Sequence, residues 1–417
     1  MKPTKQQLAF LDWEMGAFFH FGIRTFYEGH RDWDGKTMPP AGFNPTQLDC
    51  ESWIRIVKEA GLKYAILVCK HHDGFANWPS AYSSYHVGLT PWKDGKGDVV
   101  AEFVAACRKY DIKVGLYYSP AEAGSCQREA REYDDYFIHQ ISELLDGRYG
   151  VIDYLWFDGC GSEGHEYDKQ RIIRAIRGLQ PEILIFNMWD PDTRWVGNEG
   201  GAAGVDNSSV VGELDFSVMT DEKEALGTSK FLPAECDFML RRNNWFYSEY
   251  DVHTVKSVEE LVGLYYYSVG CGANFLVNIG PDRRGLLPEV DARRLLEFGA
   301  EIARRFSNPL PGDWEETDDG VTLTLDEHAL VNQIMFEEDL TEGERVEAFS
   351  VLAGSHILYK PVCVYAGKTV GHKRIVTFPA ILAGELTVRV EKSRGQAKLR
   401  NLQAFYVNAQ CTMHNAQ

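Results

Sequence analysis

The sequence predicts an α/β fold, with a (β/α)8 barrel over residues 1–306 followed by an antiparallel β-sandwich over residues 307–417. Along the first part, short apolar runs alternate with amphipathic segments, which is typical of βαβ units around a parallel sheet. Seven or eight such runs over about 300 residues favour a closed barrel over a doubly wound sheet. A change of pattern after Asn308 predicts the sandwich.

The apolar runs supply the predicted barrel strands. In chain order they are Gly16–Thr25, Tyr64–Lys70, Lys113–Ser119, Ile152–Asp158, Ile183–Trp189, Phe231–Cys236 and Phe275–Ile279, and Val210–Phe216 is a further candidate. Apolar residues recur at helical spacing between them. The helices predicted from that spacing are Thr46–Ala60, Val99–Tyr110, Glu129–Leu145, Lys169–Leu179, Ser257–Val269 and Pro288–Phe306. No G-x-G-x-x-G motif follows the first run, which argues against a dinucleotide-binding fold.

A loop separates the two predicted domains, because Asn308–Asp313 reads Asn-Pro-Leu-Pro-Gly-Asp. Short alternating runs follow it at roughly ten-residue spacing, which predicts antiparallel strands. These strands are Val321–Leu325, Val362–Ala366, Arg374–Phe378, Leu386–Val390 and Ala404–Val407.

Composition excludes several classes of protein. Hydrophobic residues make up 44% of the 417, so a sizeable core can form and a disordered chain is excluded. The net charge of −18 would repel nucleic acid. No run approaches the roughly 20 apolar residues that span a membrane. We therefore expect neither a nucleic acid nor a membrane as partner, and the oligomeric state stays open.

The cellular location follows from the N-terminus and the cysteines. Asp12 and Glu14 interrupt the first apolar stretch, so no secretory signal is predicted. The nine cysteines are scattered without a C-x-x-C pair, which argues against a zinc ribbon and suits a reducing compartment. We expect a cytoplasmic protein, and a secreted form with its signal removed stays open.

Asp158 is the first candidate for chemistry. Reactive groups of such barrels come from the carboxyl ends of the strands. With a period of two, Tyr154, Trp156 and Asp158 share one face, and Asp158 lies at the tip beside Gly159. A carboxylate there, walled by Trp156, is placed to attack or stabilise a cationic centre. A helix cap or a loop contact is the alternative.

Three histidines follow predicted strands. His71 and His72 come directly after Tyr64–Lys70, and adjacent strand residues point to opposite faces, which is poor geometry for chelating one metal. At a strand end, however, both imidazoles can bond to one polyhydroxylated ligand. His20 lies at the end of the first strand in the same way. We predict a polar ligand pocket without a metal, and a buried structural pair of histidines is the alternative.

A second carboxylate is expected in the segment Asp192–Gly201, which carries Trp, Arg and Glu side chains and is flanked by glycines. Glu199 precedes two glycines, so the loop can carry it toward a substrate. A surface glutamate in a mobile loop is the alternative. Rival carboxylates on the next segments are Glu213, Glu235 and Asp237.

Two carboxylates on opposite sides of a pocket are the catalytic groups that most glycoside hydrolases use. In retaining enzymes their oxygens lie about 5–5.5 Å apart and one carboxylate becomes covalently glycosylated. In inverting enzymes the separation is about 6.5–9.5 Å. The sequence leaves this distance open. We expect no cofactor.

The chain resembles the α-L-fucosidases of glycoside hydrolase family 29 over most of residues 12–305. The motifs that carry the resemblance are Phe19–Gly22 (FHFG), Phe43–Thr46 (FNPT), Ala65–Ser83 (AILVCKHHDGFANWPSAYS), Gly97–Val100 (GDVV), Gly115–Pro120 (GLYYSP), Leu155–Gly159 (LWFDG), Arg194–Glu199 (RWVGNE) and Asn278–Gly285 (NIGPDRRG). The resemblance implies a retaining, exo-acting α-L-fucosidase built as a barrel plus a β-sandwich. Its implied partner is a fucosylated oligosaccharide or glycan.

The resemblance also implies roles for individual residues. Asp158 matches the nucleophile, and Glu199 matches the acid/base of the subgroup that cleaves α-1,3/1,4-linked fucose in branched glycans. The implied sugar contacts and pocket walls are His20, His71, His72, Trp156, Arg194, Trp78, Tyr117 and Tyr118. Asp32 and Trp33 stand where the family often has Glu-Trp.

Several alternatives stay open. Residues 121–126 (AEAGSC) and the stretch after Glu199 lack motifs that this subgroup often carries near the leaving sugar. The acid/base is therefore open between Glu199, Glu213 and Glu235. The functional alternatives are an exo-glycosidase of another sugar preference, such as a galactosidase, and a catalytically silent carbohydrate-binding protein. A metal-dependent hydrolase is the third.

Overall fold

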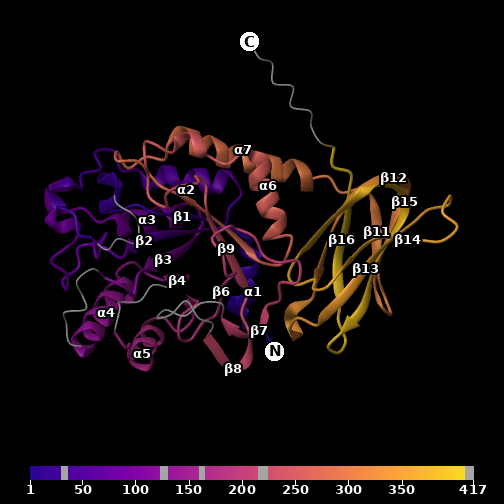
Figure 1. Cartoon of the computed structure of the whole chain (residues 1–417), viewed down its shortest axis with the longest axis horizontal. Coiled ribbons are helices and arrows are strands. Elements are labelled where there is room, and N and C mark those ends of the chain that lie inside the picture. Colours follow the sequence, from indigo (N-terminus) through magenta and orange to yellow (C-terminus); the bar gives the residue numbers. More distant parts are fainter. Residues whose placement is uncertain (30–35, 123–129, 159–164, 215–223, 409–417) are drawn as a thin grey trace, which may run out of the picture.

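The structure of the chain is a computed structural model that describes residues 1–29, 36–122, 130–158, 165–214 and 224–408. A barrel of parallel strands wrapped by helices forms one end of the elongated molecule (Figure 1). An antiparallel sheet from the C-terminal part of the chain forms the other end.

Eight parallel strands make the barrel sheet, in the order β5-β4-β3-β2-β1-β10-β9-β6. They are β1 (Met15–Phe19), β2 (Tyr64–Lys70), β3 (Lys113–Tyr118), β4 (Tyr154–Phe157), β5 (Leu184–Phe186), β6 (Arg194–Trp195), β9 (Ala234–Met239) and β10 (Asn274–Ile279). A parallel bridge between Phe186 and Thr193 joins the two outermost strands of this order. The sheet therefore closes on itself, and the predicted barrel is confirmed.

Helices cover the outside of the barrel and connect most of its strands. They are α2 (Cys50–Glu59), α3 (Val99–Lys109), α4 (Ala130–Leu145), α5 (Lys169–Leu179), α6 (Val258–Tyr267) and α7 (Glu289–Phe306). Asp49, Asp98 and Asp168 each cap one of these helices by accepting a hydrogen bond from a backbone N–H of its first turn. None of the helices in the described ranges is long and apolar enough to cross a membrane.

One barrel strand lies where we expected a loop. β6 (Arg194–Trp195) is only two residues long, so it is too short to produce a recognisable period in the sequence. The candidate Val210–Phe216 is wrong as a barrel strand. Its described part, β7 (Val210–Leu214), instead pairs antiparallel with β8 (Glu224–Phe231) in a separate two-stranded sheet.

Aromatic side chains fill the barrel interior, and an unexpected helix closes its amino-terminal end. In α1 (Lys5–Trp13), the ring of Phe10 lies 5.3 Å from that of Tyr154 and 6.1 Å from that of Tyr64. Both tyrosines are buried inside the barrel. The interior is therefore a packed core, and only its carboxyl-terminal mouth remains for a substrate.

The C-terminal sheet is antiparallel, in the order β11-β12-β15-β13-β14 with β16 beside β12. Its strands are β11 (Gly312–Thr317), β12 (Gly320–Glu338), β13 (Val346–Gly354), β14 (Val362–Gly367), β15 (Arg374–Ser393) and β16 (Leu399–Phe405). Register shifts interrupt the pairing of β12 with β15, and the sheet encloses its own apolar core. The predicted β-sandwich is confirmed, although the runs Arg374–Phe378 and Leu386–Val390 are parts of one long strand.

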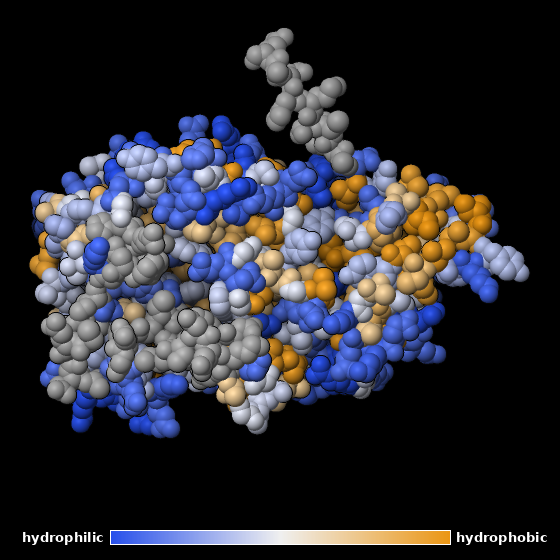
Figure 2. Space-filling model, viewed as in Figure 1, coloured by the Kyte–Doolittle hydropathy of each residue, from blue (hydrophilic) through white to orange (hydrophobic). Residues whose placement is uncertain are grey.

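The barrel and the C-terminal sheet pack against each other. The ring of Phe306 at the end of α7 lies 5.5 Å from that of Phe405 in β16. Ile375 N donates to Gly270 O at 3.0 Å, and Lys373 forms an ion pair with Glu14. Hydrophobic residues also gather on the visible face of the C-terminal sheet (Figure 2). The domain boundary at residues 306 and 307 stays a prediction.

Candidate active site

The mouth of the barrel brings together polar residues that are far apart in the sequence. His20 follows β1, His71 and His72 follow β2, and Asp158 follows β4. Because the four strands are parallel, their carboxyl ends lie at the same rim. The three histidines are buried, and the His72 side chain is 10% exposed, whereas that of Asp158 is 25% exposed. A ligand that enters the mouth can therefore reach the Asp158 carboxylate.

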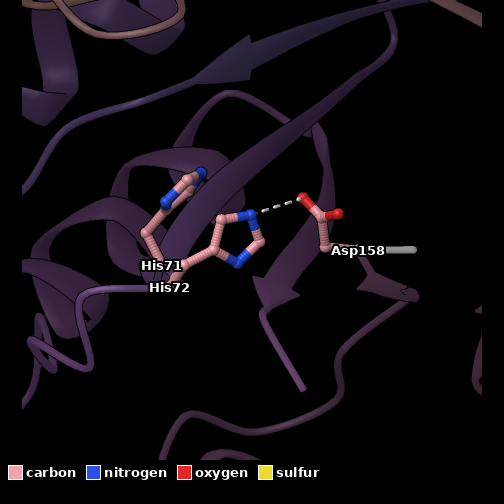
Figure 3. A group of neighbouring side chains, drawn as sticks. All are labelled: His71, His72 and Asp158. Carbon is pink, nitrogen blue, oxygen red and sulfur yellow. Dashed lines mark ion pairs between the residues drawn. The ribbon is translucent and has the colours of Figure 1, made fainter. Parts of the chain in front are cut away.

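Tyr117 holds Asp158 by a hydrogen bond, and His72 lies beside the same carboxylate. The hydroxyl of Tyr117, on β3, donates a hydrogen bond to Asp158 Oδ2 at 2.7 Å. His72 Nε2 lies 3.7 Å from the same oxygen, and Figure 3 shows this imidazole pointing at the carboxylate. One face of the carboxylate is thus fixed by the protein. The arrangement suits a nucleophile that must meet its target in one orientation.

Rings on the neighbouring strands β4 and β5 stack beside Tyr117. Its ring lies 5.4 Å from that of Trp156 at 25°, and Trp156 lies 4.1 Å from Phe186 at 9°. On its other side, Tyr117 stacks on His71 at 5.6 Å and 11°. Trp156 therefore faces the barrel interior two residues before Asp158, as the period of two predicts for β4.

His20 is a neutral imidazole with a defined tautomer. Burial lowers its pKa to about 3. The Asn278 amide nitrogen donates to the Trp245 carbonyl at 2.7 Å, so the Asn278 oxygen must accept from His20 Nδ1, also at 2.7 Å. His20 Nε2 therefore carries no proton and is an acceptor for a ligand hydroxyl.

The other two histidines are also kept neutral. Burial lowers the pKa of both, that of His71 furthest. Ser119 Oγ lies 2.5 Å from His72 Nδ1 and donates its own proton to Ala121 O, so His72 Nδ1 is the donor and Nε2 faces Asp158. His71 Nδ1 is buried and has no hydrogen-bond partner among the described residues. Such an atom is suited to a hydroxyl-rich ligand.

The backbone after β2 is locked so that both histidines meet at the rim. Asp73 forms a buried ion pair with Arg24 at 3.0 Å and accepts a hydrogen bond from Phe75 N at 2.7 Å. Gly74 adopts a φ of +83°, which side chains disfavour. The turn explains why two adjacent histidines, which would diverge on a straight strand, lie 4.2 Å apart between ring centres.

The geometry also bears on a metal. Ligand atoms of His71, His72 and Asp158 lie within 4.8 Å of one another. Asp158 Oδ2 already accepts a hydrogen bond from the Tyr117 hydroxyl. These three side chains could bind either a metal ion or the hydroxyl groups of a sugar. That the mechanism uses no metal therefore stays a prediction.

Two aromatic residues of the pocket were missed by the sequence analysis. Trp245 lies 5.0 Å from His20, and Phe246 lies 5.3 Å from His20 and 5.2 Å from His71, measured between ring centres. Both follow β9, the strand whose end we predicted three residues too early. The aromatic run Trp245–Tyr247 was the signal that could have identified them. It adds an apolar surface to the polar pocket.

Glu199 is exposed in the turn after β6. An isolated antiparallel bridge pairs the next residue, Gly200, with Phe238 of β9. Glu199 and Asp237 each precede one member of this bridge, which makes them diagonal neighbours. Diagonal neighbours project from the same face of an antiparallel pair, so the two carboxylates lie on one side. Burial and the charge of Glu199 both raise the pKa of Asp237, which agrees with this placement. Glu199 therefore lies beside the mouth of the barrel.

The rival carboxylates lie elsewhere. Glu235 is fully buried inside the barrel, where its oxygens accept hydrogen bonds from Tyr64 and Trp156, so it cannot reach a substrate at the mouth. Glu213 lies on β7, outside the barrel sheet. Asp237 is 4% exposed and accepts a hydrogen bond from Trp195 Nε1 at 2.7 Å. Glu199 is therefore the exposed carboxylate of the four that lies beside the mouth of the barrel.

Three predicted pocket residues point the wrong way. Arg194 pairs with outward-facing Ala234, and its guanidinium donates to Asn207 and Ser208 on the outside of the barrel, while Trp195 faces inward. Tyr118 donates to Gln140 of α4, and Trp78 donates to Glu143 of the same helix. All three were matched by motif, and motif matching does not reveal which face of the barrel a side chain occupies. Asp32 and Trp33 lie outside the described residues.

Comparisons with known proteins identify the family. The alpha-L-fucosidase family model matches residues 37–304. Alpha-L-fucosidase 1 of Arabidopsis thaliana is 32% identical over 94% of this chain and 85% of its own length. A putative alpha-L-fucosidase from Bacteroides ovatus is 36% identical, with a TM-score of 0.87 over 97% of this chain and 74% of that one. Another, from Bacteroides thetaiotaomicron, is 31% identical, with a TM-score of 0.87 over 97% of both chains.

The chain therefore belongs to the alpha-L-fucosidase family and is a glycoside hydrolase. The expected family and activity class are confirmed. A galactosidase or a silent binding protein is not favoured.

Replacing Tyr117 by Phe removes the hydroxyl that holds Asp158. Hydrogen bonds to charged groups are worth about 1.5–3 kcal/mol, so we expect kcat to fall roughly 10- to 100-fold on an aryl α-L-fucoside. Tyr118→Phe is the matched control, because that hydroxyl faces α4, and its kcat should stay within about twofold of wild type. Equal kcat values for both variants would contradict the role of the Tyr117 hydroxyl.

His20→Gln should change the pH dependence of stability. Because burial depresses the His20 pKa in the folded state to about 3, the wild type loses stability as pH falls from 6.5 toward 3. At pH 5 this loss amounts to about 2 kcal/mol, and the variant lacks it. Urea denaturation of both proteins at pH 7 and pH 5 measures the difference. Parallel losses in the two proteins would show that His20 takes up a proton while folded.

Proposed function

We propose that this member of the alpha-L-fucosidase family is a retaining, exo-acting enzyme that releases terminal α-linked L-fucose from oligosaccharides or glycoconjugates. The observation that carries the mechanism is Asp158, an accessible carboxylate with one face fixed by the Tyr117 hydroxyl. Such a group is prepared for nucleophilic attack on an anomeric carbon. The sugar is held in a closed-ended barrel, which suits removal of one terminal residue at a time.

Two steps complete the reaction. An Asp158 oxygen attacks the anomeric carbon of fucose, the glycosidic bond breaks, and Glu199 gives its proton to the departing glycan oxygen. Glu199, now a carboxylate, then takes a proton from a water molecule that attacks the same carbon. The ester bond to Asp158 breaks, and fucose leaves with its original anomeric configuration.

Accessibility and position support Glu199 as the acid/base. The proton donor must face both the departing glycan and the incoming water, so it has to lie at the open side of the pocket. Glu199 is exposed beside the mouth, whereas Glu235 is enclosed and Glu213 lies on a separate sheet. The bridge from Gly200 to Phe238 ties the loop to the barrel and limits how far Glu199 can move.

The pocket chemistry suits a neutral 6-deoxy sugar. Neutral histidines serve as acceptors and donors for ring hydroxyls, and His20 Nε2 and His71 Nδ1 have capacity for such bonds. The rings of Trp245 and Phe246 offer an apolar surface for the methyl group that distinguishes fucose from galactose. The mechanism requires no metal or cofactor.

We expect the preferred linkages to be α-1,3 and α-1,4. The segment Arg194–Glu199 resembles the subgroup that cleaves these linkages in branched glycans. Arg194 faces outward, however. Of this segment, only the position of Glu199 therefore supports the expected linkage preference.

Variants of the two carboxylates should behave differently with azide. Asp158→Ala removes the nucleophile and should lower kcat by about 10⁴-fold or more. Glu199→Ala should lower it about 10²- to 10⁴-fold. Because azide needs no general base, it should restore turnover of Glu199→Ala on an activated aryl fucoside and give fucosyl azide of retained configuration. Product analysis by NMR measures the outcome.

Glu213→Ala is the control for that experiment, because it removes an exposed carboxylate outside the barrel sheet. It should remain fully active without azide. Azide rescue of Glu213→Ala in place of Glu199→Ala would reassign the acid/base. Activity near wild type in Asp158→Ala would refute the nucleophile.

Linkage preference can be measured by release of free fucose from a matched set of substrates. The set comprises an aryl α-L-fucoside, an α-1,2-fucosylated glycan and an α-1,3/1,4-fucosylated branched glycan. We expect the branched glycan to give the highest kcat/KM. Faster release from the α-1,2-linked glycan would contradict the proposed preference while leaving the fucosidase activity intact.

A further inference from the structure

Glu235 is a buried carboxylate that the mechanism does not use. It lies on β9 with no exposed surface. The hydroxyl of Tyr64 donates to Oε2 at 2.6 Å, and Trp156 Nε1 donates to Oε1 at 2.8 Å. A third, longer contact runs from the Tyr154 hydroxyl to Oε1 at 3.4 Å. Strands β2 and β4 are thus tied to β9 through one side chain in the centre of the barrel.

The contacts continue upward from Glu235 to the reactive carboxylate. Trp156, which donates a hydrogen bond to Glu235, stacks beside Tyr117, its register partner on β3, at 5.4 Å. Tyr117 in turn donates to Asp158 at 2.7 Å. This column of Glu235, Trp156, Tyr117 and Asp158 runs from the barrel core to its mouth. Each member restricts the orientation of the next.

A charged carboxylate is energetically unfavourable at this buried position. Burial disfavours its charge and raises the pKa of Glu235 to about 7, even though the Tyr64 and Trp156 donors oppose the shift. An apolar side chain of similar size would fill the same space without that cost. The carboxylate gives the packed Trp156 ring a polar anchor, because the indole N–H is its one polar atom and needs an acceptor.

We propose that Glu235 is a positioning residue that sets the orientation of Asp158 through Trp156 and Tyr117, without touching the sugar. The inference rests on the proposed role of Asp158 as the nucleophile. Small displacements at a reacting centre reduce rate far more than they reduce binding. Loss of Glu235 should therefore lower kcat and leave KM nearly unchanged.

Two substitutions separate positioning from charge. Glu235→Gln keeps an oxygen for Trp156 Nε1 and offers an amide N–H to the Tyr64 oxygen, so kcat should stay within about threefold of wild type. Glu235→Leu leaves the indole N–H without an acceptor, and kcat should fall roughly 10- to 100-fold with KM within about twofold. Steady-state kinetics of the purified, folded protein measures both.

Glu143 provides a matched control, because it is also a buried carboxylate that accepts an indole N–H, from Trp78 at 2.9 Å. It lies on α4, outside the barrel interior. Glu143→Leu should lower the melting temperature but keep kcat. If Glu235→Leu likewise loses only thermal stability and keeps kcat, Glu235 is merely structural and the inference is overturned.

A double-mutant cycle tests the route. If Glu235 acts through Tyr117, the variant Glu235→Leu/Tyr117→Phe should be no more than about twofold slower than the slower single variant. Multiplicative losses would overturn that route. Should Glu235→Leu fail to fold, Tyr64→Phe replaces it in the cycle, since it removes the shortest anchor of Glu235, and the same non-additivity is expected.

The outcome for Glu235 is distinguishable from that for the proposed function. Activity in Asp158→Ala would refute the nucleophile and with it the basis of the column. An inactive Asp158→Ala together with wild-type kcat in Glu235→Leu would refute the positioning role alone.

Discussion

Closure of the eight-stranded parallel sheet is the constraint on which the rest of the structure depends. The bridge between Phe186 and Thr193 completes the ring, so every strand residue faces either a filled interior or the surrounding helices. Closure also brings all carboxyl ends of the strands to one mouth. His20, His72 and Asp158 meet there although they come from distant parts of the chain, and α1 closes the opposite end.

Burial then decides the chemistry of the groups at the mouth. The three histidines are desolvated and therefore neutral, which makes them partners for hydroxyl groups and leaves no cation on their rings. Asp158 keeps contact with solvent and is oriented by Tyr117. In the proposed function, these neutral groups bind the hydroxyls of a neutral sugar, and Asp158 is the carboxylate that reacts. This division of roles agrees with an enzyme of the alpha-L-fucosidase family.

Much of the barrel could be predicted because its signals are local. Apolar runs, their period and the polar residue at each strand end correctly indicated β2, β3 and β4 and placed Asp158 at a tip. The side chains that were assigned to the wrong side of the barrel have one cause in common. A motif match identifies the residue and does not show which face of the strand it occupies. Tyr117 and Tyr118 belong to the same motif, yet one faces the pocket and the other faces α4. Arg194 was misjudged because its two-residue strand has no period from which a face can be assigned.

By itself the sequence determined the fold class, the family and the position of Asp158 at the end of a strand, since apolar patterning and strand-end motifs are encoded by neighbouring residues. Only the tertiary structure decided that Trp245 and Phe246 line the pocket, that Arg194 faces away from it, and that Glu235 lies beneath Trp156. These facts depend on the register between strands far apart in the chain and on the burial that follows. Neither register nor burial is a property of any local stretch of residues.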